Sequence, residues 1–311
     1  MWFKNVQLFR LISPLTYDAE ALAQILKPLA FTPCLPSLPE SLGWISPLEQ
    51  SEASLVYAAN GYLMICLQFE EKILPATVIR QELETKMKVI ETTEDRKVKL
   101  KEKLSLKDEV IYSLRPRAFS RFTKLYAYFD TKRNLLIVNS VNSKKIEKFV
   151  AFLKRTATHI KFEVPTVKKP SAELTYWLQH QKTPGSFVIE KGCVLQDPSQ
   201  QTRIIRCQQQ NLFAQSIQAL IKDGCEVKQL ALSWNDEINF NLAEDFTLRN
   251  IRLQDELLTT SKEEYIETQA QQFDTDFVMM TETFAGLFTQ LLDHFIKEKS
   301  EFTAEKVEVV V

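Results

Sequence analysis

The stretch from residue 72 to residue 121 constrains the fold most, because it has helical periodicity and yet is polar on nearly every side. Its first part carries an apolar stripe at helical spacing, formed by Ile79, Leu83, Met87 and Ile90. Beyond Ile90 the stripe fades into ETTEDRKVKLKEKL. A helix with this pattern is solvated, bridges other elements or contacts a charged partner. The stretch is therefore not a core helix.

Local signals divide this stretch into two helices. Pro75 suits the first helical turn, and Pro116 ends the pattern. Ser105, followed three residues later by Asp108, resembles a capping box and predicts that the second helix begins there. We expect two helices over residues 75–116 that project from the rest of the fold.

Positive charge is concentrated in the same part of the chain. Residues 72–155 hold 21 Lys and Arg against 10 Asp and Glu, although the whole chain has a net charge of −1. Such segregation indicates an anionic partner, whereas a solvated helix surface laced with Glu–Lys pairs is the alternative. The candidate phosphate contacts are Lys72, Arg96, Lys97, Lys99, Lys101, Arg117 and Arg121.

The flanking regions predict an α+β fold of two sheet-plus-helix domains, residues 1–165 and 166–311, with the helical pair projecting from the first. Alternating patterns predict strands that include residues 2–11, 186–189 and 193–195. The dipeptides Asn60-Gly61 and Asn235-Asp236 predict hairpin turns. A helix capped by Ser143 and a long helix near Glu263–Lys297 complete the prediction.

No pattern in the sequence argues for catalysis, a metal site or a cofactor. Glycine-rich phosphate loops and CxxC pairs are absent, so most of the five cysteines are interpreted as small buried residues. Glu84 and Lys86 match the ExK fragment of some nuclease sites, but on a helix, so a metal-dependent nuclease remains an alternative. A protein-interaction scaffold built on the last helix is another. The lack of a signal peptide or long apolar run predicts a cytoplasmic protein without a membrane partner.

Phe119, inside RPRAFSRF, is the unusual residue of the basic block. An exposed phenylalanine on a charged tip would suggest a protein contact or a platform on which bases stack. The residues alone favour the other interpretation, in which Phe119 is buried in the sheet beside Phe122.

Motifs along nearly the whole chain resemble those of the RdgC family of bacterial recombination-associated proteins. They are MWFKN (1–5), AFTPC (30–34), GW (43–44), ANG (59–61), EEKILP (70–75), SLKDEV (105–110), RPRAFSRF (115–122) and FDTDFVMMT (273–281). The resemblance implies a ring-shaped homodimer with a basic central hole. It also implies binding of double- and single-stranded DNA without sequence preference, association with the nucleoid, and limited access of the RecA recombinase to DNA.

The resemblance also implies roles for individual residues. Phe119 matches a gate phenylalanine that docks into the other subunit, and Arg96 and Lys97 match basic positions that face DNA. In the second half, Gln209 stands where the family pattern has a lysine, while Gln210 keeps the family glutamine. This departure shifts the expected electrostatic contribution toward residues 72–155.

Overall fold

The computed structural model describes residues 2–48, 54–199, 202–253 and 269–296. The α+β class is confirmed, and the chain divides into two compact units. One, the arm unit, consists of Ser13–Asn134 and Asn142–Lys161. The other, the five-strand unit, consists of Met1–Ile12, Leu135–Val141 and Phe162–Val311. The domain boundary at residue 165 stays a prediction.

The sheet of the arm unit is built around the long strand β4 (Tyr62–Lys72). Strand β5 (Ser120–Asp130) pairs with β4 over its whole length, from Tyr62↔Asp130 to Lys72↔Ser120. Strands β2 (Glu40–Ile45) and β3 (Val56–Ala59) pair with successive halves of β4. The predicted turn at Asn60-Gly61 is confirmed, since both residues have positive φ, 50° and 85°.

Two helices and a short 3₁₀ turn accompany this sheet. Helix α1 (Ala19–Leu26) is capped by Asp18 and runs into η1 (Lys27–Leu29). Helix α4 (Ser143–Thr156) packs Phe149 and Phe152 against Trp44, with ring centroids 5.9 and 5.5 Å apart. The expected cap at Ser143 is wrong: Asn142 has the extended backbone of an N-cap, and its side chain accepts the N–H of Lys145 at 3.1 Å.

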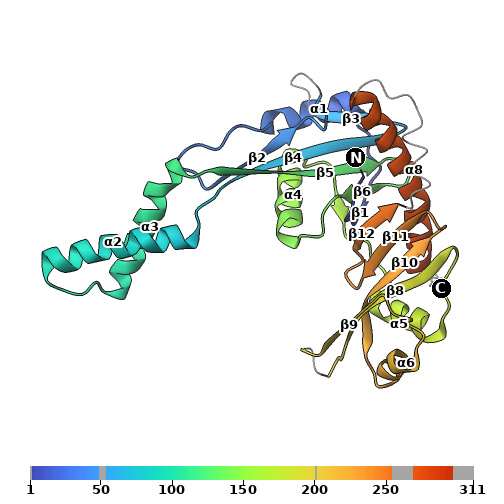
Figure 1. Cartoon of the computed structure of the whole chain (residues 1–311). Helices are drawn as coiled ribbons and strands as arrows, with labels where there is room; N and C mark the ends of the chain where they lie inside the picture. The colour runs from blue at the N-terminus through green and yellow to red at the C-terminus, as the bar shows by residue number, and fades with distance from the viewer. Residues whose placement is uncertain (1, 49–53, 200–201, 254–268, 297–311) are drawn as a thin grey trace, which may run out of the picture. The chain divides into compact units, whose positions relative to one another are not determined.

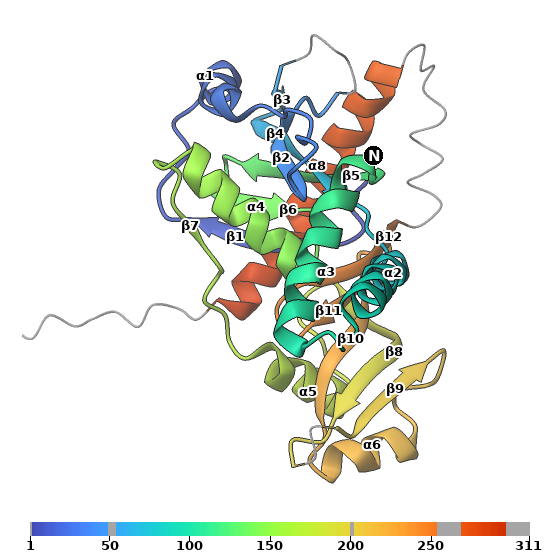
Figure 2. The same cartoon turned by 90° about the vertical axis from the view of Figure 1, so that its left-hand side faces the viewer.

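Helices α2 (Ala76–Glu94) and α3 (Leu100–Leu114) form an arm that extends beyond the ends of β4 and β5 (Figures 1 and 2). The predicted helical pair is confirmed. The two helices bury few apolar side chains, namely Leu83, Leu106 and Val110. The short turn η2 (Arg115–Arg117) leads back into β5.

The predicted start of the second helix at Ser105 is wrong. Lys99 is the extended N-cap residue, and the helix begins at Leu100. Glu102, three residues after Lys99, interacts with the Lys99 backbone N–H, which is the reciprocal half of a capping box. Ser105 lies inside the helix, where its hydroxyl donates to the carbonyl of Lys101 at 3.4 Å.

The five-strand unit contains an antiparallel sheet in the order β12-β11-β10-β8-β9. Its strands are β8 (Phe187–Gln196), β9 (Ile204–Gln208), β10 (Glu226–Trp234), β11 (Ile238–Ala243) and β12 (Leu248–Leu253). The hairpin at Asn235-Asp236 is confirmed. The two strands expected at 186–189 and 193–195 are one strand, because register shifts between β8 and β10 accommodate the residues between them.

Strand β1 (Gln7–Leu11) pairs with β6 (Leu135–Val138) and β7 (Phe162–Glu163) in the same unit. The strand predicted over residues 2–11 is therefore shorter than expected. The residues before it contact other elements instead: Phe3 N–H donates to the Met280 Sδ at 3.2 Å, and Val6 exchanges backbone hydrogen bonds with Leu248.

Helix α8 (Gln269–Phe295) confirms the long final helix, although residues 263–268 and 297 of that prediction lie outside the described residues. It buries an apolar face that includes Phe277, Phe284 and Leu291. It approaches β10 so closely that a Cβ at Gly286 would lie 2.8 Å from the Trp234 ring. Glycine is therefore needed at this crossing.

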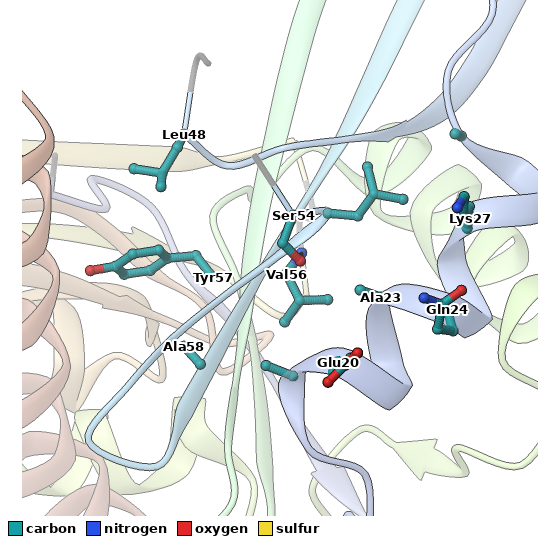
Figure 3. Close-up of a pocket in the computed structure, with 12 residues that line it drawn as sticks. Glu20, Ala23, Gln24, Lys27, Leu48, Ser54, Val56, Tyr57 and Ala58 are labelled. Carbon is teal, nitrogen blue, oxygen red and sulfur yellow. Dashed lines mark hydrogen bonds between the residues drawn. The ribbon is translucent and has the colours of Figure 1, made fainter. Parts of the chain in front are cut away.

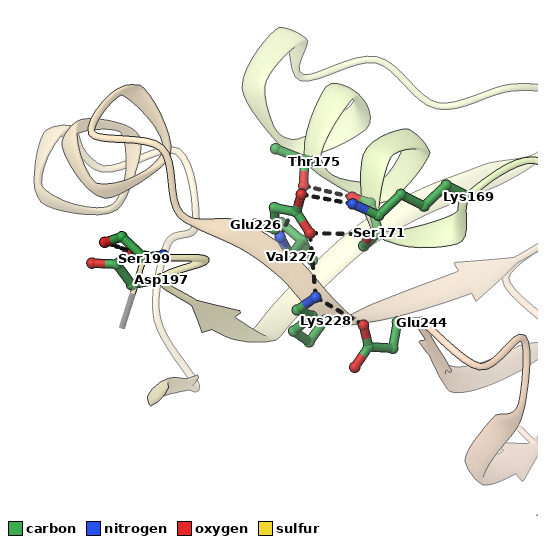
Figure 4. A network of polar contacts seen from close by, with 9 residues as sticks. All are labelled: Lys169, Ser171, Thr175, Asp197, Ser199, Glu226, Val227, Lys228 and Glu244. Atoms are coloured by element: carbon green, nitrogen blue, oxygen red, sulfur yellow. Dashed lines mark hydrogen bonds and ion pairs between the residues drawn. The ribbon is translucent and has the colours of Figure 1, made fainter. Parts of the chain in front are cut away.

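Helices α5 (Pro170–His180) and α6 (Gln215–Lys222) complete the unit. A polar network joins the start of α5 to β10 (Figure 4). In it, Glu226 accepts hydrogen bonds from Lys169 at 2.8 Å and from Lys228 at 3.2 Å. Lys228 also pairs with Glu244 at 2.9 Å. The cations of this network are thus neutralised within the unit.

All five cysteines are buried and free, which confirms the prediction that most of them are small buried residues. They are Cys34, Cys66, Cys193, Cys207 and Cys225.

Candidate nucleic-acid interface

The tip of the arm is organised by Arg96. Helix α2 ends at Glu94, and the left-handed backbone of its C-cap residue Asp95 (φ 46°) turns the chain toward α3. The Arg96 Nε donates to Glu94 at 2.6 Å, and its two terminal nitrogens donate to both Glu102 oxygens at 2.7 and 2.8 Å. These bonds raise the pKa of Arg96, Glu102 contributing most, and lower the pKa of Glu102. Arg96 therefore holds the turn closed, and two carboxylates already offset its charge.

Apart from Arg96, the predicted phosphate contacts at the tip are three lysines that flank this turn. Lys97, Lys99 and Lys101 are exposed, and none forms a salt bridge within the described part of the chain. An ammonium group on a flexible stem is free to reach a phosphate without breaking an internal pair. The structure therefore separates the predicted tip residues into one clamp, Arg96, and three available cations.

The base of the arm is held by the buried carboxylate of Glu70, which is only 4% exposed. It accepts the Ser120 hydroxyl at 2.6 Å and the Cys34 backbone N–H at 2.6 Å. The Ser120 hydrogen bond, followed by that of Cys34, holds the pKa of Glu70 below its ordinary value of 4.5. Lys72 lies 4.0 Å from the same carboxylate, so Glu70 partly neutralises its charge.

Phe119 is 85% exposed, so the expectation from the residues alone that it lies buried beside Phe122 is wrong. The Phe119 carbonyl accepts the Ile73 N–H at 2.8 Å, and the next residue is anchored to Glu70. These two contacts fix the backbone at Phe119 and at the residue after it, and the ring is left in solvent. Phe122 contacts the Phe31 ring instead, with centroids 6.4 Å apart.

Other exposed apolar side chains belong to the segments that meet at the base of the arm, where Phe119 lies. The segment that contains Leu35 and Leu38 is tied to the base of the arm by the Cys34 bond and by Arg115, which donates to the Ser37 carbonyl at 2.8 Å. We call the exposed set the base patch: Leu35, Leu38, Ile73, Phe119 and Phe122. An apolar group of this kind on a charged element is typical of an interaction surface. Only Phe119 of this set was singled out from the sequence, and the exposure of Phe119 arises from long-range hydrogen bonds that no local pattern reveals.

The remaining predicted cations of the arm unit differ in their pairing. Arg121 pairs with Glu71, its register partner across β4 and β5, at 2.7 Å. Its hydrogen bond lowers the pKa of Glu71. Arg117 is exposed and has no salt bridge to any residue that the structure describes.

Gln209 and Gln210 lie in the five-strand unit, just after β9, and both are exposed. Gln209 has a left-handed backbone (φ 52°), and the Gln210 N–H donates to the Lys191 carbonyl at 3.3 Å. The predicted residues thus belong to two separately described units.

The residues of the nuclease alternative do not gather into a recognisable centre among those described. Glu84 is exposed on α2, and Lys86 pairs with Glu109 of α3 at 3.5 Å. Within the described ranges, no three His, Cys, Asp or Glu side chains are arranged to hold a metal ion. No described helix has the length and apolar character needed to cross a bilayer.

A hollow of about 760 Å³ lies between α1 and β3 of the arm unit (Figure 3). Its lining is mainly apolar, including Ala23, Val56 and Ala58, and it also contains Glu20 of α1 and Lys27 of η1, whose charges are opposite. Because its charges cancel and its surface is apolar, it has no preference for a phosphate.

Comparisons with known proteins agree over almost the whole chain. A sequence profile described as "Putative exonuclease, RdgC" matches residues 1–298. The chain is 35% identical to the recombination-associated protein RdgC of Serratia proteamaculans (strain 568) over 294 residues, which is 94% of this chain and 97% of that protein. Proteins of the same name from Yersinia enterocolitica and Yersinia pestis (strain Pestoides F) are 34% and 35% identical over the same shares. The similarity therefore includes both compact units.

Proposed function

Because the chain belongs to the RdgC family of recombination-associated proteins, we propose that it binds DNA of any sequence, without catalysis, as a ring-shaped homodimer. One observation carries the proposal: residues 72–155 concentrate the positive charge of a nearly neutral chain, and four of its predicted phosphate contacts are exposed and unpaired among the described residues. These are Lys97, Lys99, Lys101 and Arg117.

Electrostatics supplies the binding energy in this mechanism. Lysine and arginine side chains neutralise phosphates and release condensed counterions, which requires charge along a path and no contact with base edges. Flexible ammonium groups at the tip of a solvated arm satisfy that requirement on duplex and single strand alike. Arg96 contributes by fixing the turn that presents the lysines.

Self-association accounts for the base patch. Phe119 exposes most of its ring from a backbone fixed by hydrogen bonds, so burying it in a second copy costs little additional ordering. A closed dimer around DNA would compete with a recombinase filament by occupying the same strand. Association with the nucleoid then follows from the lack of sequence preference.

The test is a salt titration with two short duplexes of unrelated sequence and a single strand, followed by fluorescence anisotropy. Equal affinities on both duplexes, with log affinity falling linearly with log salt, support the proposal. Absence of binding at low salt, or a strong preference for one duplex, contradicts it.

A nuclease is the second candidate, favoured by the description of the matching profile. Its test is incubation of end-labelled duplex with pure protein and Mg²⁺, with Glu84→Gln as the matched variant. Shortening of the labelled strand by the wild type but not by the variant would replace the non-enzymatic proposal.

A further inference from the structure

Two of the five buried cysteines lie directly opposite each other in the five-strand unit. Cys193 of β8 and Cys207 of β9 are register partners on adjacent antiparallel strands (Figure 2). Such partners have Cα atoms about 4.5 or about 5.5 Å apart, and their side chains leave the sheet on the same face. A disulfide requires a Cα separation of about 4.4–6.8 Å. The two strands therefore already hold these cysteines at the spacing that a disulfide needs.

The other three cysteines have different surroundings. Cys66 of β4 faces Ile45 and Tyr126 across its neighbouring strands. Cys225 directly precedes β10, and Cys34 lies in the segment before β2. Among the residues that the structure describes, the cross-strand pair of cysteines is thus a feature of the β8–β9 hairpin.

Strand β9 is the edge of its sheet, and few of its side chains hold it to the fold. All five of its residues are described, and Cys207 is the buried one. It ends a row of buried register partners that crosses the whole sheet, made of Leu248, Leu242, Leu230, Cys193 and Cys207. An edge strand with a single buried anchor opens locally at a lower free-energy cost than the central strands. A covalent bond at Cys207 acts on the side chain that packs β9 against the core.

We propose that Cys193 and Cys207 form a reversible disulfide that fastens the edge strand β9 to β8. Other small apolar residues would fill the same space in the core, but only cysteines in this position can be joined. The proposal concerns the covalent state of the five-strand unit and is independent of the proposed function.

The oxidant is a hydroperoxide such as hydrogen peroxide. One thiolate sulfur attacks a peroxide oxygen, the O–O bond breaks, and the leaving hydroxide takes up a proton to become water, which leaves a sulfenic acid. The second sulfur attacks the sulfenic sulfur, the S–S bond forms, the S–O bond breaks, and a second water leaves. The two thiols thus lose two electrons and two protons, and the peroxide is reduced to two waters. A dithiol reverses the change by thiol–disulfide exchange.

The surroundings of the pair make the reaction slow. Burial raises the pKa of Cys193 to about 12, and the charge of Cys207 and a hydrogen bond with it act in the same direction. Because the thiolate is the reactive form, the closed hairpin reacts poorly at neutral pH. Oxidation therefore proceeds through local opening of β9.

The first experiment treats the native full-length protein with a small excess of hydrogen peroxide and removes the excess with catalase. The remaining thiols are alkylated in denaturant before digestion with trypsin. Cleavage after lysine and arginine places Cys193 and Cys207 in separate peptides, residues 192–203 and 207–222, and neither contains another cysteine. Mass spectrometry should find these peptides joined, two hydrogen masses lighter than their sum, and separated again by dithiothreitol. Recovery of both peptides unjoined, or of either one joined to a different cysteine, would overturn the proposal.

The second experiment measures hydrogen exchange of the β9 amides before and after oxidation. In the wild type, these amides should exchange at least about 10-fold more slowly in the oxidised protein. Cys225→Ala is the matched control, because Cys225 is buried in the same unit outside the pair, and it should show the same slowing. Cys207→Ala and Cys193→Ala should show no change on oxidation, and thermal unfolding of the reduced variants verifies that they fold. Equal exchange rates in reduced and oxidised wild type would contradict the fastening of β9.

Discussion

Replacing Lys97, Lys99 and Lys101 together by glutamine should remove the main electrostatic contact of the arm. The three side chains are exposed and unpaired among the described residues, so each is available for one phosphate. If all three make contact, the slope of log affinity against log salt falls by roughly 2.7. When salt is raised from about 50 to about 200 mM, the ratio of the wild-type DNA affinity to the variant's DNA affinity then falls roughly 40-fold.

Arg96→Gln provides the matched control, because Glu94 and Glu102 already engage its guanidinium. For Arg96→Gln, the slope of log affinity against log salt should change by less than the amount expected for the loss of one phosphate contact. The assay is fluorescence anisotropy of one labelled duplex at several salt concentrations, with circular dichroism to show that the helices persist. The reasoning is refuted if the triple variant keeps the wild-type slope, or if Arg96→Gln lowers the slope by as much as the triple variant.

Other consequences can be tested on single residues. Phe119→Ala should leave the free energy of unfolding unchanged but weaken dimerisation by roughly 30-fold, which corresponds to an interface hot spot worth about 2 kcal/mol. Tyr112 is also exposed, and Tyr112→Ala should leave dimerisation unchanged. Sedimentation measures both, and an unchanged Phe119→Ala dimer contradicts the assignment. Glu70→Gln should lose about 1.5–3 kcal/mol of stability by weakening charged hydrogen bonds. Because the folded pKa of Glu70 is depressed, that loss is full above pH 4.5 and narrows as pH falls through the folded pKa. Denaturant titrations at several pH values measure the loss, and Glu84→Gln on the exposed face of α2 is the control for stability at neutral pH. A loss for Glu70→Gln that does not change with pH would contradict this account. Gly286→Ala should destabilise the folded protein by about 1–3 kcal/mol, although alanine has the better helix propensity, because its Cβ would meet a tryptophan ring. A gain in melting temperature would disprove the close approach.

Much of the fold was predictable because its signals are local. Asn60-Gly61 and Asn235-Asp236 tolerate positive φ, so the two hairpins follow from dipeptides. The arm was predictable because its sequence has helical periodicity and is polar on nearly every side. The start of α3 was missed because two competing caps lie six residues apart, and Glu102 reaching back to Lys99 favours the earlier one over Ser105.

The candidate site was predictable in composition but not in geometry. The basic block identifies the cations, but only the folded arm shows that Arg96 is held by two carboxylates while its neighbours are available to a ligand. The exposure of Phe119 depends on Ile73 and Glu70, which lie 46 and 49 positions earlier in the chain.

The central claim is that the dimer closes around DNA, and retention on circular DNA tests it most directly. The protein is bound to a circular plasmid and to the same plasmid made linear, crosslinked between subunits, and washed at about 1 M salt, where charges are screened beyond roughly 3 Å. The account predicts that the crosslinked protein stays on the circle, leaves the linear DNA, and is released when the circle is cut. Equal loss from both forms would contradict encirclement.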